Sequence, residues 1–188
     1  MRTLMQHRSI RLINLIFCFY TASALSIERI SPILMTLKSS SFAHQTQIPN
    51  HFTCDGPDVS PALSWSNIPQ NTKSLVLIVD DPDVPIPAIP IITWVHWLLY
   101  NIPPTISELP EKIMQNDLPT GTLQGKNDWK QTSYRGPCPP IGRHRYFFKL
   151  YALDTELPDL NLPNKAKLEK AMAGHIIDYA ELIGIYKR

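Results

Sequence analysis

The 188 residues suit one domain and are too few for two well-packed domains with a linker. A hydrophobic fraction of 44% with 18% charged residues excludes both a disordered chain and a polytopic membrane protein. Residues 25–188 hold 15 basic and 16 acidic side chains, so the chain lacks the basic excess of a nucleic-acid-binding protein. The 18 prolines argue against a helical bundle, because proline breaks helices.

The first 24 residues have the pattern of a secretory signal peptide. Three arginines and no acid precede a mostly apolar run at residues 12–25, and Ala22-Ser23-Ala24 provides small residues for cleavage after Ala24. An uncleaved anchor is the alternative, but the run is shorter than the ~20 residues of a spanning helix. We therefore expect a mature domain of residues 25–188 that is exported, either to a periplasm or out of the cell.

Two cysteines, Cys54 and Cys138, remain after that cleavage. An oxidising compartment would allow a disulfide between them. Two separate buried thiols are the alternative, and the sequence does not decide between the two.

Short apolar runs bounded by Pro, Asn, Asp and Gly predict a mainly β protein. The predicted strands cover residues 33–37, 63–65, 75–79, 93–100, 146–153 and 183–186. Residues 75–79 are apolar at every position, which is typical of a central strand covered on both faces.

Alternation predicts which side chains share a face in two of these strands. In residues 93–100 it groups Trp94, His96, Leu98 and Tyr100 against Val95, Trp97 and Leu99. In the strand after Gly142 it groups His144, Tyr146, Phe148 and Leu150. Residues 103–129 show no sustained period and are expected to form an irregular connection.

One helix is predicted near the carboxyl end. Residues 165–183 lack proline and space their apolar residues three or four apart, with Asn164 as N-cap and Gly184 as the C-terminal stop. We interpret its apolar stripe as core packing.

Asp81, Asp83, His96 and His144 are the residues best suited to a functional site. Taken singly, an Asp-Pro-Asp segment is usually a turn, and a histidine among apolar strand residues usually belongs to the core. Together they are better evidence for a site than any one of them alone.

These residues fall within a longer series of motifs through which the chain resembles the phosphatidylethanolamine-binding protein family, in its bacterial, Raf-kinase-inhibitor-like branch. The resemblance covers nearly all of the mature protein. Its motifs are Thr53-Cys54-Asp55-Gly56, Ser60-Pro61-Ala62-Leu63-Ser64-Trp65, Asp81-Pro82-Asp83, Trp94-Val95-His96-Trp97, Gly136-Pro137-Cys138-Pro139-Pro140 and Gly142-Arg143-His144-Arg145-Tyr146.

The resemblance implies a single-domain Greek-key β-sandwich with a small pocket at one end for phosphate or a phospholipid head group. Carried over to this chain, the family's pocket residues are Asp81, Asp83, His96, His144 and Tyr146, with Gly136 and Pro137 on another wall. No cofactor and no metal are implied.

An apolar, proline-rich segment at residues 85–92 departs from the family pattern, which has a short polar or Gly-rich turn there. If it borders the pocket, it could narrow the opening, mediate a homodimer or touch a membrane. The alternative is that it folds back onto the sandwich.

The function expected from these observations is non-enzymatic binding of a phosphorylated small molecule or phospholipid head group, in a protein that modulates a partner. One alternative is a secreted serine-protease inhibitor or another regulator that acts on proteins through its surface. Another is a metal-dependent hydrolase, because two histidines and two aspartates can ligate a metal.

Overall fold

The computed structural model describes residues 34–188, so the predicted signal peptide and its cleavage site lie outside the described residues. The strands are β1 (Thr36–Lys38), β2 (Thr46–Gln47), β3 (Leu63–Ser66), β4 (Ser74–Ile86), β5 (Ile89–Ile102), β6 (Glu108–Leu109), β7 (Leu123–Gln124), β8 (Arg143–Leu153) and β9 (Ile176–Lys187). The helices are α1 (Lys165–Met172) and two short 3-10 turns, η1 (Asn50–Phe52) and η2 (Gln115–Asp117). No helix in this part of the chain is long and apolar enough to cross a membrane.

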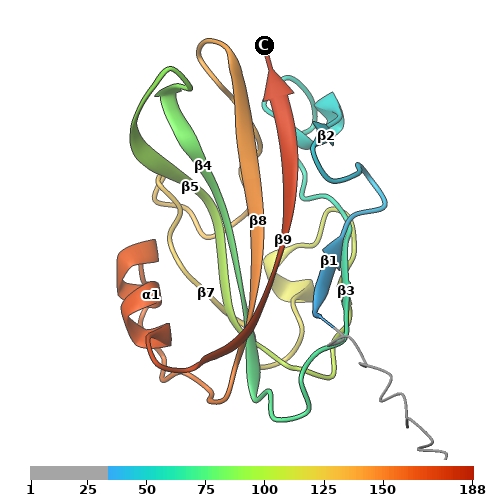
Figure 1. Ribbon diagram of the computed structural model, residues 1–188, viewed down its shortest axis with the longest axis vertical. Coiled ribbons are helices and arrows are strands. Elements are labelled where there is room, and N and C mark those ends of the chain that lie inside the picture. Colours follow the sequence, from blue (N-terminus) through green and yellow to red (C-terminus); the bar gives the residue numbers. More distant parts are fainter. Residues whose placement is uncertain (1–33) are drawn as a thin grey trace, which may run out of the picture. The chain divides into compact units, whose positions relative to one another are not determined.

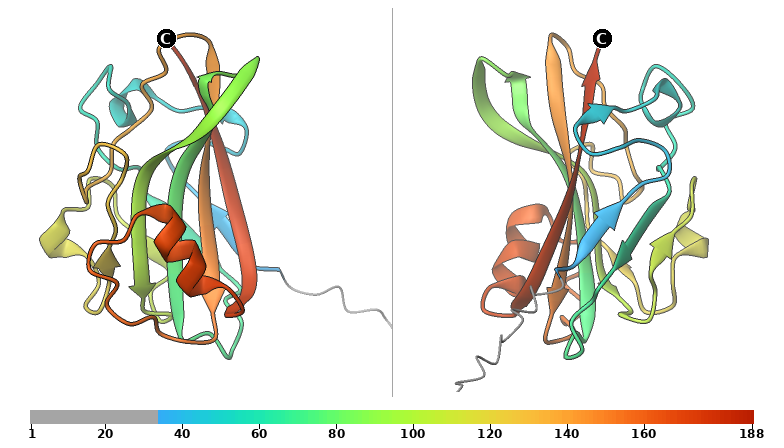
Figure 2. Two further views of the ribbon diagram at one scale, coloured as in Figure 1. Left: turned by 90° about the vertical axis from the view of Figure 1, so that its left-hand side faces the viewer. Right: turned by 45° about the vertical axis from the view of Figure 1, so that its right-hand side comes forward.

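These elements form three layers (Figures 1 and 2). A three-stranded sheet, in the order β1-β3-β6, packs on one face of a six-stranded sheet in the order β2-β9-β8-β4-β5-β7. Helix α1 covers part of the other face of the large sheet. The mainly β, two-sheet fold predicted from the sequence is confirmed, and the described residues form one domain.

Strand β4 lies at the centre of the large sheet between β5 and β8. Its residues 75–79 are all buried and alternate between the two cores. Leu75, Leu77 and Val79 face the small sheet, whereas Val76 and Ile78 face α1. The run of residues 75–79 is therefore apolar for the predicted reason, because both faces of this strand are covered by other parts of the protein.

The predicted helix is wrong beyond Met172. Asn164 caps α1 by accepting a hydrogen bond from the Lys167 amide at 2.9 Å, as predicted, but the helix ends after eight residues. Gly174 then takes a φ of +84°, and β9 pairs with β8 along its length. Gly184 is a strand residue, at which a Cβ would lie 2.4 Å from the Ile48 side chain.

A β-bulge in β5 corrects the predicted face assignment there. Val79 pairs with Trp97, but Asp80 pairs with Val95, so His96 is an extra residue on β5. As a result Val95 faces α1 together with Leu98 and Tyr100. It does not share a face with Trp97, as alternation had predicted. In β8 the alternation holds, and His144 and Tyr146 share the buried face with Phe148 and Leu150.

Residues 85–92 do not fold back onto the sandwich. They extend β4 and β5 into a two-stranded hairpin beyond the rest of the sheet (Figure 1), with Val84 opposite Ile92 and Ile86 opposite Ile89.

Candidate functional site

A cavity of about 220 Å³ lies where the hairpin leaves the sheet, beside the start of β8. It is lined by Asp81, Val84, Trp94, His96, Trp129, Cys138, Pro139, Pro140, His144 and Tyr146. Four of the predicted site residues therefore lie together: Asp81, His96, His144 and Tyr146.

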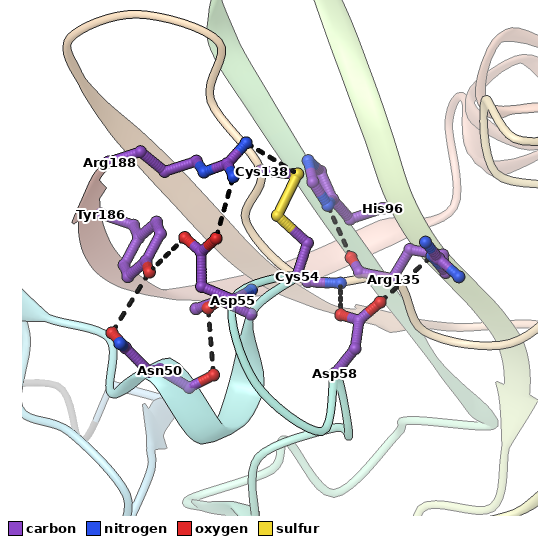
Figure 3. The surroundings of a disulfide bond; sticks show 11 residues. Asn50, Cys54, Asp55, Asp58, His96, Arg135, Cys138, Tyr186 and Arg188 are labelled. Carbon is purple, nitrogen blue, oxygen red and sulfur yellow. Dashed lines mark hydrogen bonds and ion pairs between the residues drawn. A yellow bond between two sulfur atoms is a disulfide. The ribbon is translucent and has the colours of Figure 1, made fainter.

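His96 is held by a reciprocal pair of hydrogen bonds with Arg135, and Figure 3 draws the one made by the imidazole ring. Its Nδ1 donates to the Arg135 carbonyl at 2.6 Å, and its own carbonyl accepts from the Arg135 amide at 3.2 Å. Edge-on contacts with Trp129 and Tyr146, at centroid distances of 5.1 and 5.2 Å, fix the ring plane. The bulge in β5 thus directs this imidazole into the cavity.

The His96 imidazole is neutral near pH 7. Burial lowers its pKa to about 4, and the carbonyl partner only partly opposes this shift. Because a carbonyl only accepts, the single ring proton is on Nδ1. Nε2 is therefore a hydrogen-bond acceptor until it takes up a proton.

His144 and Asp81 form a fully buried pair, with Nδ1 of the histidine 2.7 Å from Oδ2 of the aspartate. The other ring nitrogen, Nε2, lies 3.2 Å from the Ile141 carbonyl, so both ring nitrogens have protein partners. Since a bare Nδ1 would be repelled by a carboxylate, the pair holds a proton between its two members. Burial raises the pKa of Asp81, and the hydrogen bond from His144 counteracts this.

Tyr146 presents a hydroxyl group at the cavity. Its Oη is buried near the Asp81 carboxylate but makes no hydrogen bond of standard geometry within residues 34–188. Burial raises the pKa of this tyrosine, and the nearby Asp81 adds to the shift, so the group stays protonated and able to donate. A buried hydroxyl without a protein partner is uncommon in folded proteins, and at a cavity it is available to a water molecule or a ligand.

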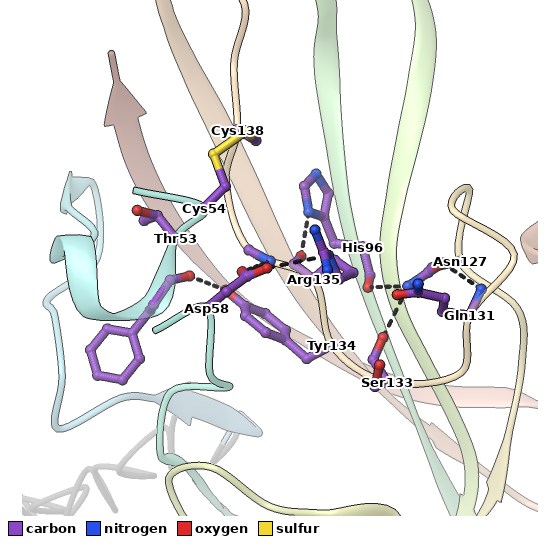
Figure 4. Close-up of polar contacts among 12 residues, drawn as sticks. Thr53, Cys54, Asp58, His96, Asn127, Gln131, Ser133, Tyr134, Arg135 and Cys138 are labelled. Carbon is purple, nitrogen blue, oxygen red and sulfur yellow. Dashed lines mark hydrogen bonds and ion pairs between the residues drawn. A yellow bond between two sulfur atoms is a disulfide. The ribbon is translucent and has the colours of Figure 1, made fainter. Parts of the chain in front are cut away.

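Trp94 and Trp129 form an aromatic wall, with their rings edge-on at 5.4 Å. Trp94 comes from β5, and Trp129 from a loop held by its neighbours. Asp128 accepts a hydrogen bond from the Val95 amide at 2.7 Å, and the Asn127 side chain bonds Ser133 and Gln131 across the loop (Figure 4). Trp129 was not predicted, because it lies in the stretch without periodicity.

A disulfide between Cys54 and Cys138 anchors the opposite wall, which continues through Pro139 and Pro140. The end of β9 braces it (Figure 3): Arg188 forms an ion pair with Asp55 at 3.0 Å, and Tyr186 donates to the same carboxylate at 2.7 Å. The sequence left the pairing of these cysteines open.

Asp83 does not line the cavity. Its carboxylate accepts hydrogen bonds from the backbone amide, Nε and Nη2 of Arg145, at 2.7–2.9 Å, and these bonds lower its pKa. The physical cause is local: Asp81 accepts from the Asp83 amide at 2.8 Å, and the register of β4 shifts between Asp81 and Val84. Two acids that regular alternation would place on one face therefore point to opposite faces.

Gly136 and Pro137 lie behind the wall and do not line the cavity. The Gly136 amide donates to Asp58 at 2.7 Å, and a Cβ there would lie 2.1 Å from the Phe52 carbonyl oxygen. The Pro137 carbonyl accepts from the Cys54 amide at 3.1 Å. Both residues therefore position the disulfide segment.

In residues 34–188, no group of three or more His, Cys, Asp or Glu side chains is placed to hold a metal ion. Nδ1 of His96 and both nitrogens of His144 already have protein partners.

Comparison with known proteins identifies the family. The model for phosphatidylethanolamine-binding proteins matches residues 38–187. A UPF0098 protein from Methanothermobacter thermautotrophicus is 47% identical over 155 residues, which cover 82% of this chain and 99% of that protein.

Two crystal structures resemble the fold of this protein, and each match covers 82% of this chain and 98% of the other chain. One is a homologue of phosphatidylethanolamine-binding protein from Chlamydia trachomatis, with a TM-score of 0.75 and 42% identity. The other is E. coli YbcL, described as a new member of the mammalian family, with a TM-score of 0.73 and 33% identity. The chain therefore belongs to the phosphatidylethanolamine-binding protein family.

Proposed function

We propose that the protein binds a small ligand bearing a phosphate group, either inorganic phosphate or the phosphoryl part of a phospholipid head group. The unpartnered hydroxyl of Tyr146, buried at the cavity, is the observation that carries this proposal. It can donate a hydrogen bond to an anionic oxygen, which makes a stronger bond than a neutral acceptor.

The charge of the cavity agrees with an anionic ligand. An unpaired carboxylate would repel phosphate, but Asp81 is hydrogen-bonded to His144 at 2.7 Å. His96 can supply a positive charge by taking up a proton at Nε2 when an anion lies against it. A phosphate that keeps its own proton could instead donate to the same nitrogen.

The size of the cavity limits the ligand. Its volume of about 220 Å³ is below the ~300 Å³ at which pockets for drug-sized ligands begin, so a head group fits and an acyl chain does not. Trp94 and Trp129 both line the cavity, and aromatic side chains attract an ammonium group such as that of ethanolamine.

Binding in an exported protein, and not catalysis, is the function we propose. The one cysteine of the lining is in a disulfide, so it offers no free thiol as a nucleophile. That disulfide also supports export, because such bonds persist chiefly in oxidising compartments. No residue of the cavity argues for protease inhibition or for modulation of a partner protein.

Histidine NMR during titration with phosphate and with phosphoethanolamine tests the proposal. We expect saturable shifts at His96 and His144 and none at exposed His51 and His175. Tyr146→Phe should weaken binding by about tenfold or more, the cost of one hydrogen bond to a charged group.

Tyr151→Phe is the matched control for that variant. This tyrosine comes from the same strand but faces the other core, and its variant should bind within about twofold of the parent. Shifts confined to the exposed histidines, or equal losses in the two variants, would refute the proposal.

A further inference from the structure

The hairpin tip forms an exposed apolar surface next to the cavity. Ile89 and Ile91 are 60% and 73% exposed, and Ile141, in the loop before β8, is 69% exposed. A Cβ on Gly142 would lie 3.5 Å from Pro87, so this loop and the hairpin are neighbours at the end where the chain terminates (Figures 1 and 2). We call Ile89, Ile91, Ile92 and Ile141 the isoleucine tip.

The same two segments build the cavity. Val84 and Trp94 flank the hairpin, and Pro139 and Pro140 precede Ile141; all four line the cavity. A surface that contacts the isoleucine tip therefore also lies close to the cavity.

Proline content argues against strand pairing with another protein or a second copy. Residues 84–92 include Pro85, Pro87 and Pro90, which have no backbone N–H, and natural edge strands use proline to block pairing. The same lack of donors suits an apolar environment, where an unpaired N–H is costly. No residue from 84 to 92 carries a charge.

Basic side chains adjoin the tip. Arg143, Arg145 and Arg188, three of the four arginines in residues 34–188, lie at this end on β8 or after β9. Arg145 and Arg188 have aspartate partners. Arg143 lies directly opposite Lys187, both are exposed, and neither has an ion pair within the described residues. Like charges placed opposite each other repel, so this pair favours an anion that lies across it.

We propose that the isoleucine tip and the Arg143–Lys187 pair dock the protein on an anionic phospholipid membrane. The isoleucines enter the head-group layer, the two basic side chains contact lipid phosphates, and the cavity lies next to the lipid surface. Docking does not depend on the proposed function; the two together would let the cavity take a head group directly from the membrane.

Sedimentation with vesicles tests this proposal, using the full chain and vesicles of phosphatidylcholine with and without one quarter phosphatidylglycerol. We expect the parent to prefer the anionic vesicles. Ile89→Ser/Ile91→Ser should lower the partition coefficient more than tenfold. Arg143→Gln/Lys187→Gln should lower it about fivefold for each charge, and only on anionic vesicles.

Matched controls lie far from this end. Leu162→Ser/Ile176→Ser removes exposed apolar residues beside α1, and Lys73→Gln/Lys170→Gln removes two exposed charges. Both should sediment like the parent, which also accounts for any contribution of the N-terminal segment common to all variants.

Two further readouts separate this proposal from its alternatives. The hairpin variant should still bind phosphate, whereas Tyr146→Phe should still bind vesicles, so each proposal can fail alone. Equal sedimentation of the hairpin variant and the parent would overturn docking. So would ultracentrifugation that shows the isoleucine changes convert a dimer to a monomer without altering sedimentation with vesicles.

Discussion

Asp81→Ala should destabilise the protein far more than Asp83→Ala, although the two acids are only two positions apart. Asp81→Ala leaves His144, which is 0% exposed, without its partner and removes the acceptor of the Asp83 amide. Breaking a buried pair from one side costs about 3–5 kcal/mol. In Asp83→Ala the released Arg145 side chain is 56% exposed and water can solvate it, which leaves a cost of about 1–2 kcal/mol for the Arg145 amide.

Urea unfolding at pH 7, followed by tryptophan fluorescence with the disulfide intact, measures both variants. With a slope of about 2 kcal/mol/M, the Asp81→Ala midpoint should fall by about 2 M and the Asp83→Ala midpoint by less than about 1 M. Equal losses, or a larger loss for Asp83→Ala, would show that the buried Asp81–His144 pair is not the contact that holds this end of the sheet.

Three further changes have expected results of their own. Because His96 is neutral in the fold with a pKa of about 4, the unfolded chain alone takes up this proton between pH 6.5 and 4. Wild type should therefore lose about 3 kcal/mol of stability as the pH falls through that interval, and His96→Gln should show a shallower slope in denaturation curves. Cys54→Ser/Cys138→Ser opens a crosslink between residues 84 positions apart and should cost about 2–5 kcal/mol, measured against the oxidised parent. Gly136→Ala places a Cβ 2.1 Å from the Phe52 carbonyl oxygen and should lower the melting temperature by several degrees; an unchanged value would contradict the close packing behind the cavity wall.

Much of the six-stranded sheet could be predicted from the spacing of apolar side chains along the sequence. The continuous run at residues 75–79 predicted the central strand, and alternation in β8 placed His144 and Tyr146 on one buried face. Those two residues reach the cavity because nothing interrupts the ladder between β8 and β9 near them.

Local irregularities in strand pairing explain the features that the spacing of apolar residues could not predict. The extra residue at His96 turns the Val95 side chain to the opposite face of the sheet. The register shift after Asp81 directs the Asp83 side chain away from the cavity. Both depend on pairing with a distant strand. The same holds for residues 173–183, whose helical spacing of apolar residues was outweighed by pairing with β8 after Gly174.

Loop residues of the site carry no periodic signal at all. Trp129 reaches the cavity because Asp128 bonds the Val95 amide, a contact between residues 33 positions apart. Val84 also lines the cavity and was not predicted to do so. It lies beside the insertion at residues 85–92, and the sequence did not decide whether that insertion borders the pocket.

Isothermal titration calorimetry with inorganic phosphate, in two buffers of different ionisation enthalpy at pH 7, tests the central claim most directly. If the neutral His96 takes up a proton from solution when phosphate binds, binding must draw protons from the buffer and tighten from pH 8 to pH 6. Saturable binding with net proton uptake, lost in His96→Phe, is the predicted result. Phosphate heats indistinguishable from dilution would contradict the assignment of this cavity as a phosphate site, whereas saturable binding that draws no proton would contradict the protonation of His96.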